Sequence, residues 1–250
     1  MNRGEKVLSV YFPAGFPDSE TSEYAIDLIA KSGADIIEIG IPFSDPLADG
    51  KTIQKASEIS LRSGFRVSNA FGIAERAKSA NTDVHFIFMT YYNILVRIGE
   101  EKFIKTAKNC GVDGLIIPDL PPEESETITE ISKNNEMSTV FLVAPTSTKE
   151  RIKLIDEKTT GFIYYVSVKG VTGVRDKLPE DIAIKIQNLK NTVKNYVIVG
   201  FGISKKEQVK EICRISDGVI LGSVIIDMFL SGLERKEISN FINNIKEACC

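Results

Sequence analysis

The stretch Gly33-Ala-Asp-Ile-Ile-Glu-Ile-Gly40 decides the fold of this 250-residue chain. A glycine and a short polar turn are followed at once by a short apolar run, which is typical of a helix that ends and a buried strand that begins. A similar short turn occurs at Gly111-Val-Asp113 and at Ser216-Asp-Gly218, each before another apolar run. The repetition indicates a series of strand–helix units and carries no information about chemistry.

The alternation extends through the whole chain. Short apolar runs predict strands at Lys6–Phe12, Ile36–Gly40, His85–Thr90, Gly114–Ile117, Thr139–Val143, Phe162–Ser167, Tyr196–Phe201 and Val219–Leu221. Amphipathic runs predict helices at Thr21–Lys31, Thr52–Arg62, Ser68–Lys78, Glu101–Asn109, Pro122–Lys133, Lys149–Lys158, Pro179–Thr192, Lys205–Ile215 and Lys236–Ala248. Strands that alternate with helices are parallel, so about eight such units predict a single (β/α)₈ TIM barrel over residues 1–250.

The structural alternative is a doubly wound open sheet. Such a sheet usually has a glycine-rich loop with G-x-G-x-x-G spacing after its first strand. Here the first strand leads into Pro13-Ala-Gly-Phe-Pro17, which lacks that spacing.

Composition excludes several classes of protein. The chain is 43% hydrophobic and 26% charged with a net charge of −3, which excludes disorder and argues against nucleic-acid binding. One histidine and four cysteines without a Cys-x-x-Cys pair predict no metal site, and no cofactor is expected. There is no signal-peptide pattern and no apolar run near the ~20 residues of a membrane helix. We expect a cytoplasmic protein that does not bind membranes.

Glu38 is the sharpest candidate for chemistry, because it stands in an otherwise apolar strand. Alternation places Glu38 on the same face as Ile36 and on the opposite face from Ile37. Burial raises the pKa of a carboxyl and suits it to proton transfer near neutral pH. The alternative is a structural, salt-bridged glutamate.

A second carboxylate follows in the loop after that strand. Asp49 lies before Gly50 and is expected on the same rim as Glu38, where two carboxylates in different environments divide acid and base roles. The alternative for Asp49 is a turn or a helix cap, and the same holds for Asp45 and Asp119. Asp18 is interpreted as a helix cap.

Two tyrosine pairs and the single histidine complete the polar candidates. One member of Tyr91-Tyr92 and one of Tyr164-Tyr165 should face the mouth of the barrel, with core filling as the alternative. His85 begins a strand, at the end opposite the expected site, and is interpreted as structural.

Glycines follow the last three strands, in Gly170-Val-Thr-Gly173, Gly200-Phe-Gly202 and Gly222-Ser223. Loops seven and eight of a barrel frequently bind phosphate through backbone N–H groups, and glycine lets the backbone approach the anion. The residues therefore predict a barrel that binds a phosphorylated small molecule and performs proton chemistry with carboxylates, as an isomerase, lyase or aldolase.

The run Ile36–Ser57, IIEIGIPFSDPLADGKTIQKAS, resembles the signature of the tryptophan synthase α subunit family. The resemblance continues through Tyr11–Asp18, Met89–Leu95, Gly111–Ser125, Gly161–Gly173, Gly200–Val209 and Ile220–Val224, in the family's order. It implies retro-aldol cleavage of indole-3-glycerol phosphate to indole and glyceraldehyde 3-phosphate. It also implies a tryptophan synthase β subunit as partner, in an α₂β₂ heterotetramer, and no cofactor.

The resemblance also assigns roles to residues. Glu38 matches the family's acid-base residue, and Asp49 matches the residue that hydrogen-bonds the indole N–H. The residues that match substrate-binding positions are Tyr164, Tyr91, Phe201 and Thr172, and those that match phosphate-binding positions are Gly173, Gly202, Gly222 and Ser223.

The chain departs from the family before Gly170, where Val168 and Lys169 stand in place of a frequent arginine. Loop closure and communication with a β subunit are expected to differ there. Three alternatives stay open from the residues: a Schiff-base aldolase that uses Lys169, another phosphate-binding barrel enzyme, and a subunit that only activates its partner.

Overall fold

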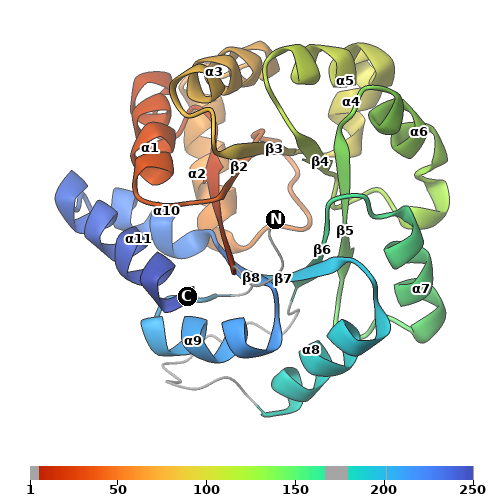
Figure 1. Ribbon diagram of the computed structural model, residues 1–250. Coiled ribbons are helices and arrows are strands. Elements are labelled where there is room, and N and C mark those ends of the chain that lie inside the picture. Colours follow the sequence, from red (N-terminus) through yellow and green to blue (C-terminus); the bar gives the residue numbers. More distant parts are fainter. Residues whose placement is uncertain (1–5, 167–179, 201, 250) are drawn as a thin grey trace.

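The computed structural model describes residues 6–166, 180–200 and 202–249. Eight parallel strands close into a barrel in which each strand pairs with the next and β8 pairs with β1 (Figure 1). The predicted barrel is confirmed, and the open sheet is wrong because it would leave β1 and β8 unpaired with each other. The strands are β1 (Val7–Pro13), β2 (Ile36–Gly40), β3 (His85–Met89), β4 (Gly114–Ile116), β5 (Ser138–Val143), β6 (Phe162–Val166), β7 (Tyr196–Gly200) and β8 (Gly218–Leu221).

Helices surround the barrel on its outer side (Figure 1). Their bounds are α1 (Ser19–Lys31), α2 (Lys51–Arg62), α3 (Val67–Ala80), α4 (Tyr92–Ile98), α5 (Glu100–Asn109), α6 (Glu126–Asn134), α7 (Lys149–Lys158), α8 (Glu180–Thr192), α9 (Lys206–Ile215), α10 (Ser223–Leu230) and α11 (Arg235–Cys249), with a 3₁₀ turn at Pro122–Glu124. The sequence analysis did not predict α4, because seven residues are too few for a helical pattern to stand out. The predicted helix Pro122–Lys133 is divided into the 3₁₀ turn and α6.

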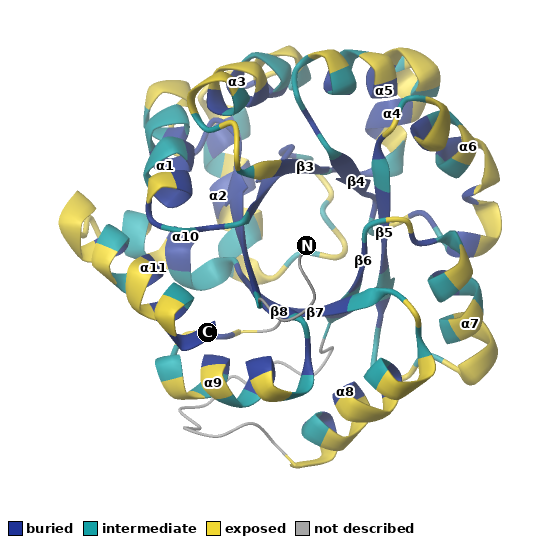
Figure 2. Cartoon of the chain, viewed as in Figure 1, coloured by how far each residue is buried: buried dark blue, intermediate teal, exposed yellow. Residues whose placement is uncertain are grey.

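Two apolar layers follow from the alternation of side chains along each strand. The inner layer fills the barrel and contains Val7, Ile36, Ile87, Ile116, Val140, Phe162, Ile198 and Ile220. The outer layer lies between strands and helices, where Phe88 of β3, Phe71 of α3 and Phe103 of α5 meet with ring centroids 5.3–6.2 Å apart. Figure 2 shows the buried strands inside helices whose outer faces are exposed.

The repeated turns before the strands carry a repeated hydrogen-bond pattern at the amino-terminal mouth of the barrel. Asp217 precedes β8, and its N–H donates to the carbonyl of Val197 on β7 (2.8 Å). The Asp217 carboxylate then accepts from the N–H of the same Val197 (2.8 Å). We call this reciprocal pair of hydrogen bonds an aspartate latch, because it joins the turn before one strand to the beginning of the neighbouring strand.

Two further aspartate latches have the same form. Asp35 binds Leu8 of β1 through bonds of 2.9 and 2.7 Å, and Asp113 binds Phe86 of β3 through bonds of 2.7 and 3.0 Å. Before β6, Thr160 takes the same place, with its N–H donating to the Thr139 carbonyl (3.1 Å) and its hydroxyl accepting from the Thr139 N–H (2.9 Å). Each of the four even-numbered strands is therefore preceded by a residue that forms this reciprocal pair of hydrogen bonds with the neighbouring strand. The repeated turns seen in the sequence thus have a structural role.

Each aspartate latch also pairs with a lysine. Lys190 of α8 pairs with Asp217, Lys78 of α3 with Asp113 (3.5 Å), and Lys246 of α11 with Asp35 (2.7 Å). These ion pairs tie the outer helices to the base of the barrel.

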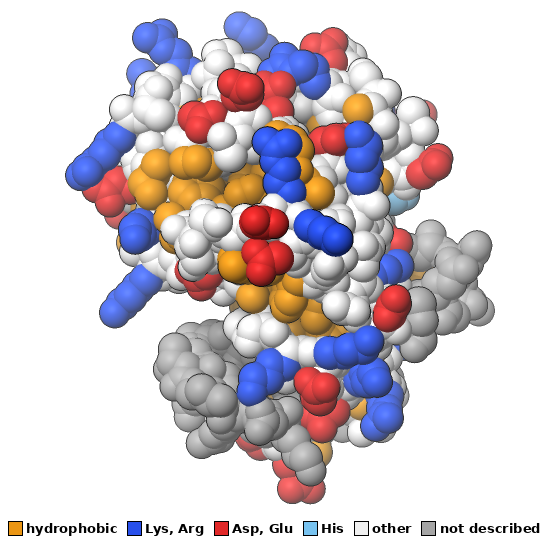
Figure 3. All heavy atoms as spheres, turned by 90° about the vertical axis from the view of Figure 1, so that its left-hand side faces the viewer, with side chains coloured by type: hydrophobic (Ala, Val, Ile, Leu, Met, Phe, Trp, Pro, Cys, Tyr) orange, Lys and Arg blue, Asp and Glu red, His pale blue; other side chains and the backbone are white. Residues whose placement is uncertain are grey.

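The outer surface carries mixed charge. On the flank shown in Figure 3, basic and acidic side chains are interspersed among apolar ones, and neither sign gathers into a single patch. Among the helices that the structure describes, none is both long and apolar enough to cross a membrane.

The aspartate latches predict where the barrel is sensitive to mutation. Asp217→Ala removes the acceptor of a charge-assisted bond from a side chain that is only 16% exposed, so the free energy of unfolding should fall by about 2 kcal/mol. Asp217→Asn keeps an acceptor and should recover more than half of that loss. Urea unfolding measures both changes, with the exposed Asp83→Ala as a control that stays within about 0.5 kcal/mol of the parent. A loss for Asp217→Ala no larger than the control's would contradict the prediction.

Candidate active site

The Glu38 carboxyl lies inside the barrel and has no exposed surface. Its Oε1 accepts a hydrogen bond from the hydroxyl of Ser9 on β1 (2.7 Å), and its Oε2 has no hydrogen-bond partner among the described residues. Burial raises the pKa of Glu38 to about 7, although the bond from Ser9 opposes the rise. Glu38 shares the inner face of β2 with Ile36, so the predicted alternation is confirmed, and the alternative of a salt-bridged glutamate is wrong within the described residues.

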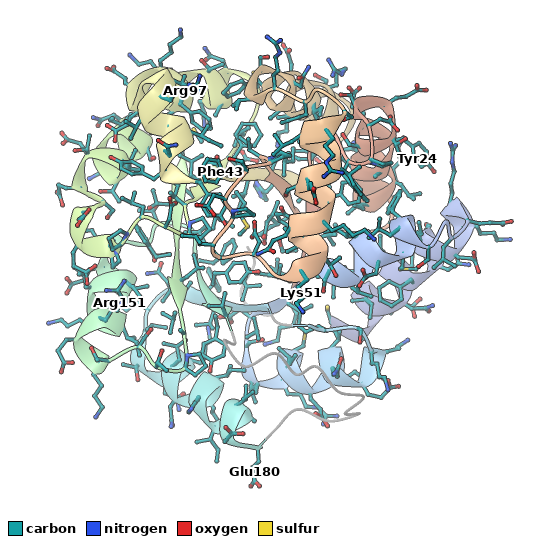
Figure 4. All side chains as sticks on the ribbon, turned by 180° about the vertical axis from the view of Figure 1, so that it is seen from behind. Tyr24, Phe43, Lys51, Arg97, Arg151 and Glu180 are labelled. Carbon is teal, nitrogen blue, oxygen red and sulfur yellow. The ribbon has the colours of Figure 1, made fainter. Side chains whose placement is uncertain are left out.

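Asp49 lies in the loop between β2 and α2, above the carboxyl end of β2. Burial raises its pKa to about 6, and a hydrogen bond with the Tyr91 hydroxyl limits the rise. The same hydroxyl accepts from the N–H of Ala48 (3.1 Å), and the Tyr91 ring stacks on Phe43 with centroids 5.0 Å apart. Tyr91 therefore holds the loop at both ends. Figure 4 looks onto this mouth, with Phe43 between α4, which carries Arg97, and α2, which begins at Lys51.

Two further tyrosines face the carboxylates from inside the barrel. Tyr11 pairs in register with Glu38, and Tyr164 projects inward from β6. Burial, and then the nearby charges of Glu38 and Asp49, raise the pKa of both phenols, so both stay protonated as hydrogen-bond donors. Tyr165, the neighbour of Tyr164, faces the outer layer instead, as alternation requires.

Glycines at two strand ends make room for these rings. A Cβ added to Gly40 would lie 2.1 Å from the Tyr11 hydroxyl oxygen, and one added to Gly200 would lie 2.6 Å from that of Tyr164. Both contacts are shorter than any real Cβ contact, so the phenols occupy the space where side chains of β2 and β7 would otherwise stand.

The glycine loops of β7 and β8 lie at this same mouth, because all eight strands are parallel. Gly202, with a φ of +43°, and Ser223 line one cavity of about 370 Å³, together with Ser204 and Asp227. Gly222 caps α10 and accepts from the N–H groups of Ile225 (3.0 Å) and Ile226 (3.3 Å), so the donors of the first turn without a helical acceptor are those of Ser223 and Val224, which line the cavity. Backbone donors therefore gather at this cavity. Phe201, Thr172 and Gly173 lie outside the described residues.

The other polar candidates do not join the site. His85 opens β3 at the amino-terminal mouth, where its Nδ1 lies 3.4 Å from the Asp113 carboxylate. Asp119 accepts from the N–H of Tyr92 (2.9 Å) and so stabilises the beginning of α4, while Asp18 caps α1 by accepting from Thr21 (2.8 Å). Lys169, the residue of the Schiff-base alternative, lies outside the described residues. No group of three potential metal ligands lies together within the described ranges.

The sequence analysis missed Ser9 and gave Tyr11 no role at the site. The signal for Ser9 is a polar residue within the apolar run of β1, with the same parity as Tyr11. Parity alone does not show that this face meets Glu38, because that depends on the register between β1 and β2.

Comparison with known proteins agrees with this geometry. The family model described as "Tryptophan synthase alpha chain" matches residues 1–248. The tryptophan synthase alpha chain of Aquifex aeolicus is 45% identical over 245 residues, which cover 97% of this chain and 93% of the relative. That of Methanocaldococcus jannaschii is 46% identical over 234 residues, which cover 94% and 83%.

Solved structures give the same result. A structure of Mycobacterium tuberculosis tryptophan synthase superposes with a TM-score of 0.91 at 33% identity, over 98% of this chain and 93% of that chain. A structure from Aquifex aeolicus superposes with a TM-score of 0.89 at 42% identity, over 98% and 93%. Together with the buried carboxyl at the mouth of a closed barrel, these matches show that the chain belongs to the tryptophan synthase alpha chain family of lyases.

Proposed function

We propose that this chain cleaves indole-3-glycerol phosphate to indole and glyceraldehyde 3-phosphate, with Glu38 as the acid-base residue. The observation that carries the proposal is a fully buried carboxyl with a pKa of about 7 and one oxygen left without a partner among the described residues. Such a group holds a proton when substrate arrives at neutral pH and can lose it during turnover.

The chemistry needs a proton at carbon 3 of the indole ring. Glu38 donates that proton, which turns the ring into an indoleninium-like cation. The hydroxyl on the adjacent glycerol carbon then loses its proton to Glu38 or to water, and the carbon–carbon bond breaks. Its electron pair returns to the ring, so that neutral indole and the aldehyde are released and Glu38 regains its proton.

Asp49 is the residue that stabilises the positive charge developing on the indole ring during this step. With a pKa of about 6, Asp49 is largely ionised at neutral pH, and its bond to Tyr91 fixes its direction. We assign Asp49 to the indole nitrogen, where it stabilises positive charge in a water-poor site. The protonated phenols of Tyr11 and Tyr164 border the same space, and Tyr91 acts through Asp49.

The cavity beside Gly202 and Ser223 suits the phosphate of the substrate. Backbone N–H groups at the beginning of α10 and the helix dipole both favour an anion there. Gly222 belongs to the same turn. The roles that the resemblance gives to Phe201, Thr172 and Gly173 complete this part of the proposal.

The partner of the proposed enzyme is a tryptophan synthase β subunit in an α₂β₂ assembly in the cytoplasm. Leu47 is 84% exposed in the loop that carries Asp49, and Val96 of α4 is 55% exposed. Large apolar side chains exposed around the substrate mouth are what a partner would cover. Relatives with solved structures are named as tryptophan synthase, which supports the assignment.

Glu38→Gln should lower the rate of indole release by about 10³-fold or more, because the amide has no proton to give. Asp49→Asn should lower the rate by about 10²-fold, because the neutral amide no longer stabilises the ring cation. The measurement is indole release from indole-3-glycerol phosphate, with and without an added β subunit.

Binding of indole-propanol phosphate serves as the control for both variants and should change little. Near-normal turnover in either variant would refute the role given to that residue. An inactive parent chain, alone and with the β subunit, would instead favour a subunit that only activates its partner. A covalent adduct trapped by borohydride would favour a Schiff-base aldolase.

The raised pKa of Glu38 also predicts a pH-dependent stability. The ordinary pKa is 4.5 and the folded value is about 7, so between these values the folded chain holds a proton that the unfolded chain has lost. Stability therefore falls as pH rises through this window. Glu38→Gln removes this pH dependence. The difference in unfolding free energy between Glu38→Gln and the parent should therefore shift in favour of the variant by roughly 2–3 kcal/mol from pH 5 to pH 8. A constant difference in urea unfolding would rule out the raised pKa.

A further inference from the structure

Ser9 is an unexpected residue for its position. It faces the inside of the barrel from β1, has no exposed surface, and pairs in register with Ile36 of β2 and Ile220 of β8. A buried hydroxyl among apolar side chains is costly unless it forms a hydrogen bond. Its bond to Glu38 Oε1 at 2.7 Å is the one recorded for this hydroxyl within the described part of the chain.

In this bond the Ser9 hydroxyl is the donor and Glu38 Oε1 is the acceptor. If Glu38 Oε1 carried the acid proton and donated to Ser9, the serine hydrogen would need a second acceptor, and none is recorded among the described residues. With Ser9 as donor, the serine hydrogen has its acceptor, Oε1 is the carbonyl-type oxygen of the neutral acid, and the hydrogen left without a described acceptor is the acid proton. The acid proton then belongs to Oε2, the oxygen without a described partner.

The register also gives the direction of approach. Tyr11 stands level with Glu38, and Ser9 stands level with Ile36, one inward-facing position closer to the amino-terminal mouth. The serine hydroxyl therefore reaches the carboxyl from the floor of the barrel. Substrate reaches the same carboxyl from the opposite side, where Asp49 and the glycine loops lie.

We propose that Ser9 is a positioning residue for proton transfer at Glu38: its hydroxyl holds Oε1 from below and leaves Oε2 as the oxygen that gives and takes the proton. This inference rests on the function proposed above. The bond fixes the rotation of the carboxyl, so that one oxygen faces the reacting carbon in every turnover. It also stabilises the carboxylate after proton donation, because the donor favours the charged form.

The other groups around Glu38 do not duplicate this bond. Among the described residues, Tyr11 of β1 and Tyr164 of β6 are the titratable side chains that face it inside the barrel, and Asp49 faces it from the loop above. The neighbouring strand β3 contributes Ile87 and Met89, which are apolar. Removal of the Ser9 hydroxyl should therefore act on Glu38 directly.

Ser9→Val and Ser9→Thr form the matched pair for the test, because they have nearly the same shape and only threonine keeps the hydroxyl. The measurement is kcat for indole release against pH, with the β subunit present. We expect Ser9→Val and Ser9→Ala to lower kcat about tenfold through the misplaced carboxyl. The descending alkaline limb of the profile should move up by about one pH unit, because Glu38 keeps its proton to higher pH. Ser9→Thr should restore both.

Matching kcat values and matching limbs for Ser9→Val and Ser9→Thr would overturn the inference, since packing alone would then explain any change. Glu38→Gln separates this outcome from failure of the proposed function. If Glu38→Gln is inactive while the Ser9 variants match the parent, only the role of Ser9 falls. If Glu38→Gln keeps its activity, the proton donor is another group and both proposals fall.

Discussion

A carboxyl buried inside a parallel barrel is the constraint on which this active site depends. Moving Glu38 out of water disfavours its ionised form, and within the described residues one hydroxyl, that of Ser9, takes the place of the lost solvent. One bond is enough to hold the group in place, and it leaves the carboxyl in balance between its two protonation states near neutral pH. A cationic partner would have lowered the pKa and removed the acid. A Glu38 carboxyl without any hydrogen-bond donor would have had nothing to stabilise its ionised form after it gave up the proton.

The two mouths of the barrel use the same residue type in opposite ways. At the amino-terminal mouth, burial works to raise the pKa of Asp113, but bonds from His85 and the Phe86 N–H and the charge of Lys78 outweigh burial and lower it. At the carboxyl mouth, burial raises the pKa of Asp49 and a single tyrosine opposes it. Carboxylates with several donors hold strands together, whereas carboxylates with one donor remain available for chemistry.

Much of this division was predictable from the sequence. The repeated turns and apolar runs predicted eight strands that agree closely with the observed ones, and the isolated Glu38 in an apolar strand indicated an inward-facing acid. The fold followed because strand and helix periodicities are local signals. Helix α4 was missed because its seven residues are too short for that signal. The role of Ser9 was missed because it depends on a contact across 29 residues, which only the register of β1 against β2 creates. The roles given to Phe201, Thr172 and Gly173 stay predictions.

The pairing of β1 with β8 sets an order of events during synthesis. Lys6 donates to the carbonyl of Ser216, 210 residues further along the chain, and Val7 pairs with Gly218. A ribosome adds about 5–20 residues per second, so β1 waits on the order of ten seconds or more before its partner emerges. Throughout that time one edge of the growing sheet has no neighbour, and such an edge can pair with a strand of another chain. The late arrival of β8 therefore makes this edge the point at which pairing with another chain competes with closure of the barrel.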